Sequence, residues 1–322
     1  METAGFFRNK KVLVTGASGF IGSNLVHRLV GEQASTAVLV RRSSDLWRLE
    51  EILPELDLCY ADLEDASAVH NALNDVRPEM VFHCGAYGVD SRQQDYATAV
   101  RVNVIGAINL FNAAAEAGCY KIVNTGTCME YGDKKELITE DCEARPLEIY
   151  GITKLWATMI AHRIAAEKSI KLITLRPFGV FGGREGSHKF FPHLILSILD
   201  GREVRLTSCE QYRDYCFIDN IIDGFLLAAR DQTLDNEIFN IAGGKAYKLK
   251  YYVNLVYKIM KAEGEPQYGA VPYRNNEMWK QQPDVAKIRN TLHWEAKISL
   301  EEGLERTIAW YRENRGKYPT GR

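Results

Sequence analysis

The sequence predicts an α/β fold: a doubly wound parallel sheet covered by helices on both faces, followed by a smaller C-terminal domain. Over the first half of the chain, short apolar segments alternate with amphipathic helical segments. The apolar segments read as continuous runs, which is typical of parallel strands that are buried on both faces. A glycine-rich turn joins the first strand to the first helix, and beyond residue 176 the alternation loosens.

The alternating half predicts six strands and the helices that connect them. Strands are expected at Lys11–Thr15, Ala37–Val40, Leu58–Ala61, Met80–His83, Lys121–Asn124 and Lys171–Leu175. Helices are expected at Ile21–Val30, Ser67–Leu73, Thr98–Ala117 and Ile149–Lys168. Because crossovers between parallel strands are right-handed, these elements give a doubly wound Rossmann sheet.

The second half predicts fewer and more widely separated elements. Helices are expected at Phe190–Leu199, Lys248–Lys261 and Leu300–Glu313. The last helix is preceded by Ser299-x-x-Glu302, a capping signature. Glu203–Thr207 is expected as a strand, and Phe217–Arg230 as a strand end that runs into a helix. We therefore predict a dinucleotide-binding domain over residues 1–176, to which segments of about 212–243 return, and a mostly substrate-binding domain over 177–322.

The bulk composition excludes several classes of protein. Of the 322 residues, 46% are hydrophobic and 25% are charged, and the net charge of −2 gives no reason to expect nucleic acid or an anionic membrane as partner. No apolar run approaches the ~20 residues that cross a bilayer, and Met1–Lys11 lacks a signal-peptide core, so we expect a cytoplasmic protein. The seven cysteines and seven histidines show no ligand spacing, so no metal is expected.

Three glycines, Gly16, Gly19 and Gly22, follow the first strand and open the first helix. The first permits a tight turn, the second lets the backbone approach a pyrophosphate, and the third lets the helix pack on the strand. The helix N-terminus adds N–H groups and a partial positive charge, although a purely structural turn is the alternative. The expected cofactor contacts are Thr15, Gly16, Ser18, Gly19, Phe20, Ile21 and Gly22.

The end of the second strand predicts which dinucleotide binds. NAD-binding proteins usually place an acid there, whereas this chain has Arg41-Arg42-Ser43-Ser44. The additional phosphate of NADP carries roughly −1.5 to −2 charges, which suits Arg41, Arg42 and Ser44. We therefore expect NADP(H), with an arginine that merely faces solvent as the alternative. Asp62 and Leu63 are expected beside the adenine, although a plain helix cap at Asp62 explains that residue equally well.

Further motifs identify a resemblance over nearly the whole chain. They are Thr127–Gly132, Tyr150-x-x-x-Lys154, Arg176–Gly182, Arg213–Asp219, Trp294, Leu300–Gly303 and Trp310-Tyr311. With the glycine loop, these motifs resemble the extended short-chain dehydrogenase/reductases. The similarity is greatest to the nucleotide-sugar-modifying branch, which is NAD-dependent epimerase/dehydratase-like and includes the nucleotide-sugar 4-ketoreductases.

The resemblance implies a catalytic triad of Thr127, Tyr150 and Lys154. A tyrosine has an ordinary pKa near 10, and lowering it by about three units takes about 4 kcal/mol of preference for the phenolate. One cation at ~4 Å contributes about that much, so Lys154, assisted by an oxidised nicotinamide, is expected to activate Tyr150. Thr127 is expected to hydrogen-bond the substrate oxygen. Other cofactor contacts that the resemblance implies are Tyr87, Asn103, Thr125, Lys154 and Pro177.

Members of this family differ in the two residues after the catalytic threonine. Dehydratases place Asp-Glu there, whereas decarboxylases place Glu and C3/C5 epimerases place Cys at the second position. This chain has Cys128 and Met129, of which methionine cannot exchange protons. A thiol with a pKa near 8.5 acts as a base only if activated, and a small buried residue is the simpler interpretation. That leaves reduction of a ketosugar or inversion at C4.

The arginine pair favours reduction, because a reductase consumes NADPH whereas C4 epimerases usually recycle a tightly bound NAD. We therefore expect an NADPH-dependent reductase of a nucleotide-linked 4-keto-6-deoxy sugar. A nucleotide-sugar 4-epimerase is the nearest alternative. A non-catalytic dinucleotide sensor is the second, although such proteins usually lose the tyrosine or the lysine.

The substrate is expected to bind against residues from both halves of the chain. They are Thr127, Cys128, Met129, Gly179, Lys189, Arg213 and Arg274, with Arg184 as a further candidate. The resemblance places Arg213 against a nucleotide diphosphate, which needs cationic donors. Relatives commonly have Asn at the position of Gly179. The helices expected around 98–117 and 149–168 form a homodimer interface in this family, so we expect a homodimer. Their small residues permit close packing, although a monomeric core would use them equally well.

Overall fold

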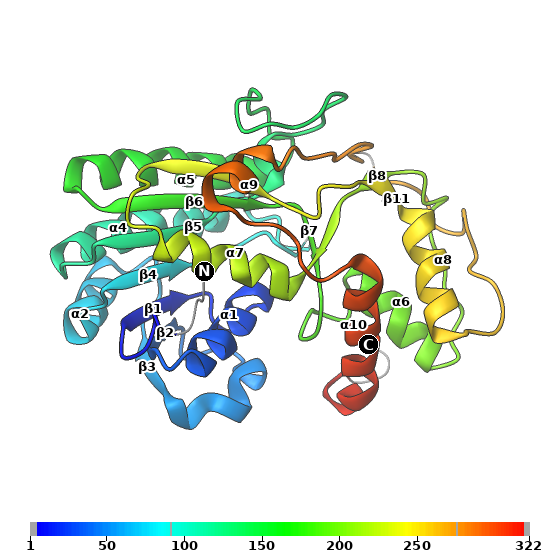
Figure 1. Cartoon of the computed structure of the whole chain (residues 1–322), viewed down its shortest axis with the longest axis horizontal. Coiled ribbons are helices and arrows are strands. Elements are labelled where there is room, and N and C mark those ends of the chain that lie inside the picture. Colours follow the sequence, from blue (N-terminus) through cyan, green and yellow to red (C-terminus); the bar gives the residue numbers. More distant parts are fainter. Residues whose placement is uncertain (1–4, 91, 275, 319–322) are drawn as a thin grey trace.

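The computed structural model describes residues 5–90, 92–274 and 276–318 (Figure 1). Its centre is a seven-stranded parallel sheet with the strand order β10-β6-β5-β4-β1-β2-β3. The strands are β1 (Lys11–Thr15), β2 (Ser35–Val40), β3 (Leu56–Tyr60), β4 (Met80–His83), β5 (Lys121–Thr125), β6 (Lys171–Pro177) and β10 (Glu237–Ile241). The predicted doubly wound α/β fold is confirmed, and all six predicted strands lie in this sheet.

Helices cover both faces of the sheet, which explains the continuous apolar strands. On one face α1 (Phe20–Gly31) packs against α7 (Ile218–Arg230). On the other, α4 (Gly106–Glu116) lies between α2 (Ala66–Val76) and α5 (Ile149–Lys168). In β1 the side chains of Val12 and Val14 join the core under α1 and α7, whereas Leu13 joins the core under the other three helices.

The helix expected at 98–117 is interrupted. It consists of α3 (Tyr96–Ala99), a π-helical turn η2 (Val100–Ile105) and α4. A π-turn inserts an extra residue into the helix and commonly marks a functional site. Here it accompanies a buried Asn103, whose side chain reaches the loop after β4.

A smaller lobe of helices and short strands lies on the right in Figure 1. The helices are α6 (Phe190–Leu199), α8 (Leu249–Met260) and α10 (Leu300–Glu313), and α9 (Ala286–Leu292) lies beside β10. The parallel pair β7 (Gly179–Phe181) and β9 (Tyr215–Phe217) leads from the large sheet toward this lobe, and β8 (Tyr212–Arg213) pairs with β11 (Tyr247–Lys248). Short helical turns are η1 (Trp47–Glu55), η3 (Cys128–Glu130) and η4 (Arg315–Lys317).

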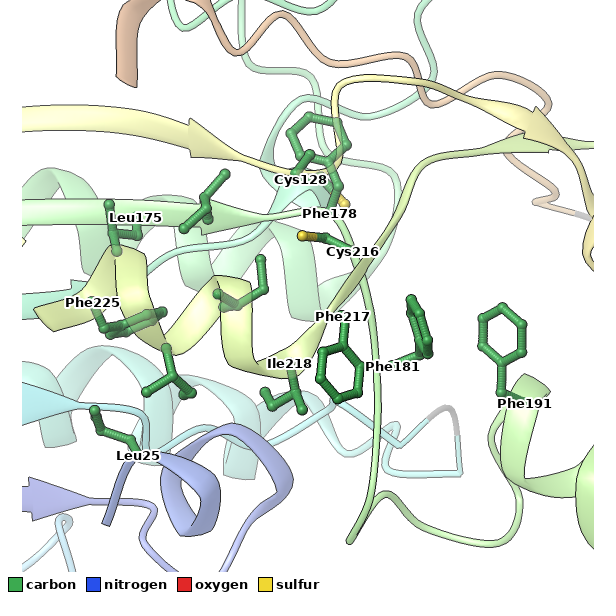
Figure 2. Packing of buried hydrophobic residues seen from close by; sticks show 14 of the residues in the cluster. Leu25, Cys128, Leu175, Phe178, Phe181, Phe191, Cys216, Phe217, Ile218 and Phe225 are labelled. Atoms are coloured by element: carbon green, nitrogen blue, oxygen red, sulfur yellow. The ribbon is translucent and has the colours of Figure 1, made fainter. Parts of the chain in front are cut away.

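Aromatic packing joins the two parts. Figure 2 shows Phe181, Phe217 and Phe191 near one another where β7, β9 and α6 meet. The ring of Phe181 lies 4.9 Å from that of Phe191 and 5.7 Å from that of Phe217. These rings belong to the same core as Leu25 and Phe225 under the large sheet, so the lobes share one hydrophobic interior.

The strand expected at Glu203–Thr207 is wrong. Only one bridge forms there, between Arg205 and Gln267. The partner segment cannot continue a ladder, because Pro266 has no N–H group and Gly269 turns the chain with a φ of +77°. Within the described residues, no helix is long and apolar enough to cross a membrane.

Candidate active site

The turn after β1, residues 15–22, forms a concave backbone loop that we call the cradle. Two of its positions have no room for a side chain. Gly16 has a φ of +66°, and a Cβ there would lie 2.5 Å from the carbonyl carbon of Cys84. A Cβ on Gly22 would lie 2.2 Å from the Gly16 oxygen. Gly19 directly precedes α1 and has no side chain to cap the helix. The first N–H groups of the helix therefore remain available to an anion. This backbone fits the pyrophosphate of a dinucleotide.

Side chains from distant segments hold the cradle in place. The Ser18 carbonyl accepts a hydrogen bond of 3.1 Å from Arg48, a residue that sequence analysis did not single out. The Thr15 hydroxyl accepts from the Gly85 N–H at 3.2 Å and contacts His83 Nδ1 at 2.7 Å. Burial lowers the pKa of His83 to about 3, so its imidazole is neutral, in keeping with a structural role. Phe20 and Ile21 form the first turn of α1.

The residues after β2 form a tight turn at the same edge of the sheet. The Arg41 N–H donates to the Ser44 hydroxyl at 3.1 Å, and the Ser44 N–H donates to the Arg41 carbonyl at 2.9 Å. Both arginine side chains are exposed, and Arg42 lies 5.0 Å above the ring of Tyr60. Within the described ranges neither guanidinium has a carboxylate partner, so both charges are available to a phosphate.

Asp62 does not cap a helix. Its carboxylate accepts the Glu64 N–H at 3.1 Å, whereas Asp65, the residue directly before α2, caps that helix by accepting the Ala68 N–H at 3.0 Å. The helix-cap alternative for Asp62 is therefore wrong. The next residue, Leu63, is 9% exposed and packs against Gly85 in the floor of the cradle.

The structure brings Thr127, Tyr150 and Lys154 together at the end of β5. Tyr150 and Lys154 lie one turn apart on α5, and the Thr127 side chain is close enough to the Tyr150 phenol to lower its pKa. Burial raises the pKa of Tyr150, and Thr127 opposes this only in part. Among the described residues, Thr127 and not Lys154 is the side chain that lowers the pKa of Tyr150, so the expected lowering by Lys154 is not observed. The phenol is therefore protonated in the chain itself, and it can accept a proton only after losing its own.

The remaining expected cofactor contacts lie around this cluster. Both N–H groups and the oxygen of the Asn103 amide are used, by the Tyr87 backbone at 2.9 and 2.7 Å and by the Thr153 hydroxyl at 2.9 Å. Asn103 therefore holds the Tyr87 loop against α5. The Thr125 hydroxyl contacts the Cys84 thiol at 3.4 Å, and Pro177 is buried at the end of β6.

The expected substrate residues are brought together only in part. Arg213 is paired with Glu277 at 2.6 Å. Lys189 donates to the Val89 carbonyl at 2.7 Å, and its pKa is lowered, first by burial and also by nearby Arg274. Arg184 does not join them, because it faces Glu51 at 3.7 Å. No cluster of three or more metal-ligating side chains occurs among the residues that the structure describes.

A family model of the NAD dependent epimerase/dehydratase family matches residues 12–242, which include the cradle and the Thr127–Tyr150–Lys154 cluster. The chain belongs to this family. The UDP-glucose 4-epimerase of Mycolicibacterium smegmatis is 27% identical over 312 residues, covering 94% of this chain and 98% of that protein. The solved UDP-glucose 4-epimerase of Thermotoga maritima, with UDP-glucose, has a TM-score of 0.88 at 29% identity and covers 94% of this chain and 99% of its own. MoeE5, solved with UDP-glucose and NAD, has a TM-score of 0.84 at 28% identity. The match covers 95% of this chain and 99% of MoeE5.

The surroundings of Gly179 exclude the asparagine that the resemblance led us to expect there. A Cβ at this position would lie 2.5 Å from both the Asp214 carbonyl oxygen and the Tyr215 ring. The asparagine that relatives commonly carry therefore does not fit here. The aromatic ring of Tyr215 takes that space.

Sequence analysis missed Glu130, a fully buried carboxylate beneath the cluster. Its Oε1 accepts the Thr127 N–H at 2.9 Å, and its Oε2 accepts two bonds from Arg176 at 2.9 and 2.7 Å. Thr127 and Glu130 cap η3 reciprocally. The charge of Glu130 also favours the protonated form of Lys154, whose pKa burial lowers. The Thr127-x-x-Glu130 spacing is a capping signature that could have indicated this turn.

Cys128 and Met129 face a residue that sequence analysis also missed. Gln281, which is 6% exposed, approaches both sulfur atoms from the segment before α9. Burial raises the pKa of Cys128 to about 12, so this thiol stays protonated at neutral pH. Nothing in the sequence around Gln281 indicates this contact, because 153 residues separate it from Cys128.

Proposed function

We propose that this enzyme inverts the C4 configuration of a nucleotide sugar by reversible hydride transfer. The observation that carries the proposal is the Thr127–Tyr150–Lys154 cluster next to a neutral Cys128 and Met129. Elimination or decarboxylation needs a second acid/base group there, and neither side chain supplies one. The likeness to UDP-glucose 4-epimerases supports this reaction over net reduction.

The proposed mechanism assigns a role to each of the main site residues. A nicotinamide dinucleotide, when bound, supplies the hydride acceptor and donor. The Thr15–Gly22 loop binds its pyrophosphate, and Lys154 holds its nicotinamide ribose and supplies positive charge beside Tyr150. Tyr150 exchanges the proton of the reacting sugar oxygen, and Thr127 fixes that oxygen by a hydrogen bond. Asn103 positions the Tyr87 loop against α5.

A second candidate is the NADPH-dependent reduction of a nucleotide-linked 4-keto-6-deoxy sugar. One observation favours it: Arg41 and Arg42 are exposed and without carboxylate partners in the described part of the chain, so they suit the additional phosphate of NADP(H). Under either reaction, Arg213, Lys189 and Arg274 are the cations proposed to face the diphosphate.

One experiment separates the two candidates. The purified protein is incubated with UDP- and dTDP-linked hexoses and, separately, with 4-keto-6-deoxy sugar nucleotides plus NADPH. Conversion of a hexose to its C4 epimer without net change of cofactor supports the epimerase. Stoichiometric NADPH oxidation by a keto sugar, without epimerisation of any hexose, would replace it with the reductase.

We also propose a homodimer built on α5 and the η2 region. Four large apolar side chains there are exposed, although the two elements pack on one another: Tyr96, Ile105, Trp156 and Met159. A stable second copy would remove these side chains from water. The division near residue 176 and the cytoplasmic location both stay predictions.

A further inference from the structure

Three sulfur atoms and one amide form a wall beside Thr127. Cys128 and Met129 directly follow Thr127, whereas Met278 and Gln281 come from the segment before α9. The Gln281 Nε2 atom lies 3.6 Å from Cys128 Sγ, 3.7 Å from Met278 Sδ and 3.9 Å from Met129 Sδ. We call these four residues the sulfur wall.

The backbone that carries the Gln281 side chain is anchored on both sides. The Gln281 N–H donates to the Tyr212 carbonyl at 3.1 Å, and the next residue, Gln282, accepts the Ile138 N–H at 2.8 Å. The segment is thus hydrogen-bonded on both sides, to β8 and to the loop after η3. A donor carried by such a segment needs little reorganisation when a ligand arrives.

The Gln281 amide donates only to weak acceptors. Gln281 is 6% exposed, Cys128 7% and Met278 9%, so water has little access. Thioether and thiol sulfur accept hydrogen bonds weakly, and a buried N–H group without a strong acceptor is unfavourable. A sugar oxygen beside Thr127 would be a much better acceptor. The amide is therefore placed for a ligand oxygen.

The sulfur wall carries no charge. The Cys128 thiol stays protonated because burial raises its pKa to about 12, and the other three side chains are neutral. The cation that acts on Cys128, Arg213, is already paired with Glu277 at 2.6 Å. A sugar carboxylate facing this wall would lose its water and gain a neutral donor but no cation, which is unfavourable.

Building on the proposed function, we propose that the sulfur wall is the sugar subsite of this active site. Gln281 donates a hydrogen bond to a sugar oxygen close to the reacting carbon that Thr127 and Tyr150 hold. The three sulfur side chains contact the apolar edge of the ring. The subsite therefore selects nucleotide-linked neutral hexoses and rejects uronic acids.

The test is titration calorimetry on the cofactor-loaded protein with UDP-glucose, UDP-glucuronic acid and UDP, and with dTDP-glucose and dTDP as a second nucleotide series. The wild type is expected to bind UDP-glucose at least tenfold more tightly than UDP-glucuronic acid. Gln281→Leu is expected to weaken hexose binding about tenfold, as for one lost hydrogen bond, and to leave the affinity for UDP or dTDP unchanged. Gln282→Leu, the same change at the neighbouring residue, is the matched control.

Three results would overturn the subsite: uronate binding as tight as hexose binding, unchanged hexose affinity in Gln281→Leu, or equal losses for hexose and free nucleotide. Equal losses for hexose and free nucleotide would mean that Gln281 acts on the fold or on the nucleotide site. A lowered melting temperature of the variant would indicate the fold, and an unchanged one the nucleotide site. A wild type that retains cofactor but binds no nucleotide sugar would instead overturn the proposed function itself.

Discussion

Tyr150 is the residue on which the proposed proton transfer depends. Its phenol lies close to Thr127, and burial keeps it protonated. Tyr150→Phe removes only the hydroxyl, so we expect kcat to fall by about 10²–10⁴-fold while cofactor affinity is kept. Steady-state assays and a cofactor titration measure both quantities. Tyr96→Phe, at a tyrosine that is 70% exposed, is the control, and retained turnover in Tyr150→Phe would remove Tyr150 as the acid.

Arg41 and Arg42 are the residues that we expect to discriminate between NADP and NAD. Both are exposed at the end of β2, and a phosphate there would gain charge-assisted hydrogen bonds. We expect the wild type to bind NADP more tightly than NAD, and Arg42→Asp to lower the ratio of the two affinities by about tenfold or more. Fluorescence titration with each dinucleotide measures this ratio. Arg312→Asp, at another exposed arginine, should leave it unchanged, and equal wild-type affinities would refute the NADP prediction.

At the scale of elements, Glu130 ties the turn η3 to β6 and α5. Glu130→Gln keeps an acceptor for the Thr127 N–H but removes the charge that favours protonated Lys154. The pKa of Lys154 should then fall further, so the alkaline limb of the kcat/KM profile should move to lower pH. Thr158→Ala removes a 3.3 Å hydrogen bond to the same carboxylate without changing its charge, and should leave the limb in place. A limb that stays fixed in Glu130→Gln would restrict Glu130 to a structural role.

The loop between β7 and α6 predicts a pH dependence of stability. Its Glu185 is buried, and Tyr311 and Tyr318 both donate to its carbonyl at 2.9 Å. Burial raises the pKa of its carboxyl to about 8, against the opposing effects of Lys189 and Arg48. A raised carboxyl pKa means that the folded state holds the proton more tightly, so stability is highest at low pH and is lost between about 4.5 and about 8.

Thermal unfolding across this pH range checks the prediction. Glu185→Gln cannot ionise, so its melting temperature should fall less steeply with pH than that of the wild type. Asp214, whose pKa burial raises to about 7, acts in the same direction and should leave part of the slope. Glu265→Gln, at an exposed carboxylate, is the control, and parallel slopes for Glu185→Gln and the wild type would contradict the assignment.

Local patterns predicted many elements well. The bounds of β1, β4, α5, α6 and α10 agree with the sequence prediction, because apolar periodicity and caps such as Ser299 are encoded within each segment. The strand at Glu203–Thr207 failed because its partner segment contains Pro266, 59 residues beyond Thr207 in sequence. The π-turn η2 was not predicted either, since its residues share the apolar pattern of an ordinary helix.

The site shows the same division between local and distant information. Glycine spacing and Tyr150-x-x-x-Lys154 predicted which residues meet at the cradle and cluster. Arg48 and Gln281 were missed because their partners lie in other elements. For Glu130 the local capping signature with Thr127 was present, but its pairing with Arg176 depends on a distant strand. Arg213 was singled out, but its 2.6 Å pairing with Glu277 depends on a contact across 64 residues.

For the whole molecule, the exposed apolar face on α5 predicts a dimer. Trp156 is 49% and Met159 63% exposed. Exposing such large apolar side chains to water is unfavourable for a monomer, whereas a dimer interface would bury them. Sedimentation velocity is expected to show a dimer for the wild type and a monomer for the Trp156→Asp, Met159→Asp double variant. Tyr251→Asp, at an exposed aromatic residue of the smaller lobe, should remain dimeric. A monomeric wild type would refute the interface.

The position of β10 at the edge of the large sheet has a consequence for how the chain folds during synthesis. Its residues Glu237–Ile241 pair with β6 only after the chain has already passed through β7, α6 and β9 in the smaller lobe. A ribosome must therefore translate the chain as far as Ile241 before the edge of β6 is covered. Until then β6 offers unpaired backbone groups to other strands. Chaperones that shield nascent edges should accordingly matter most while residues 178–241 are being made.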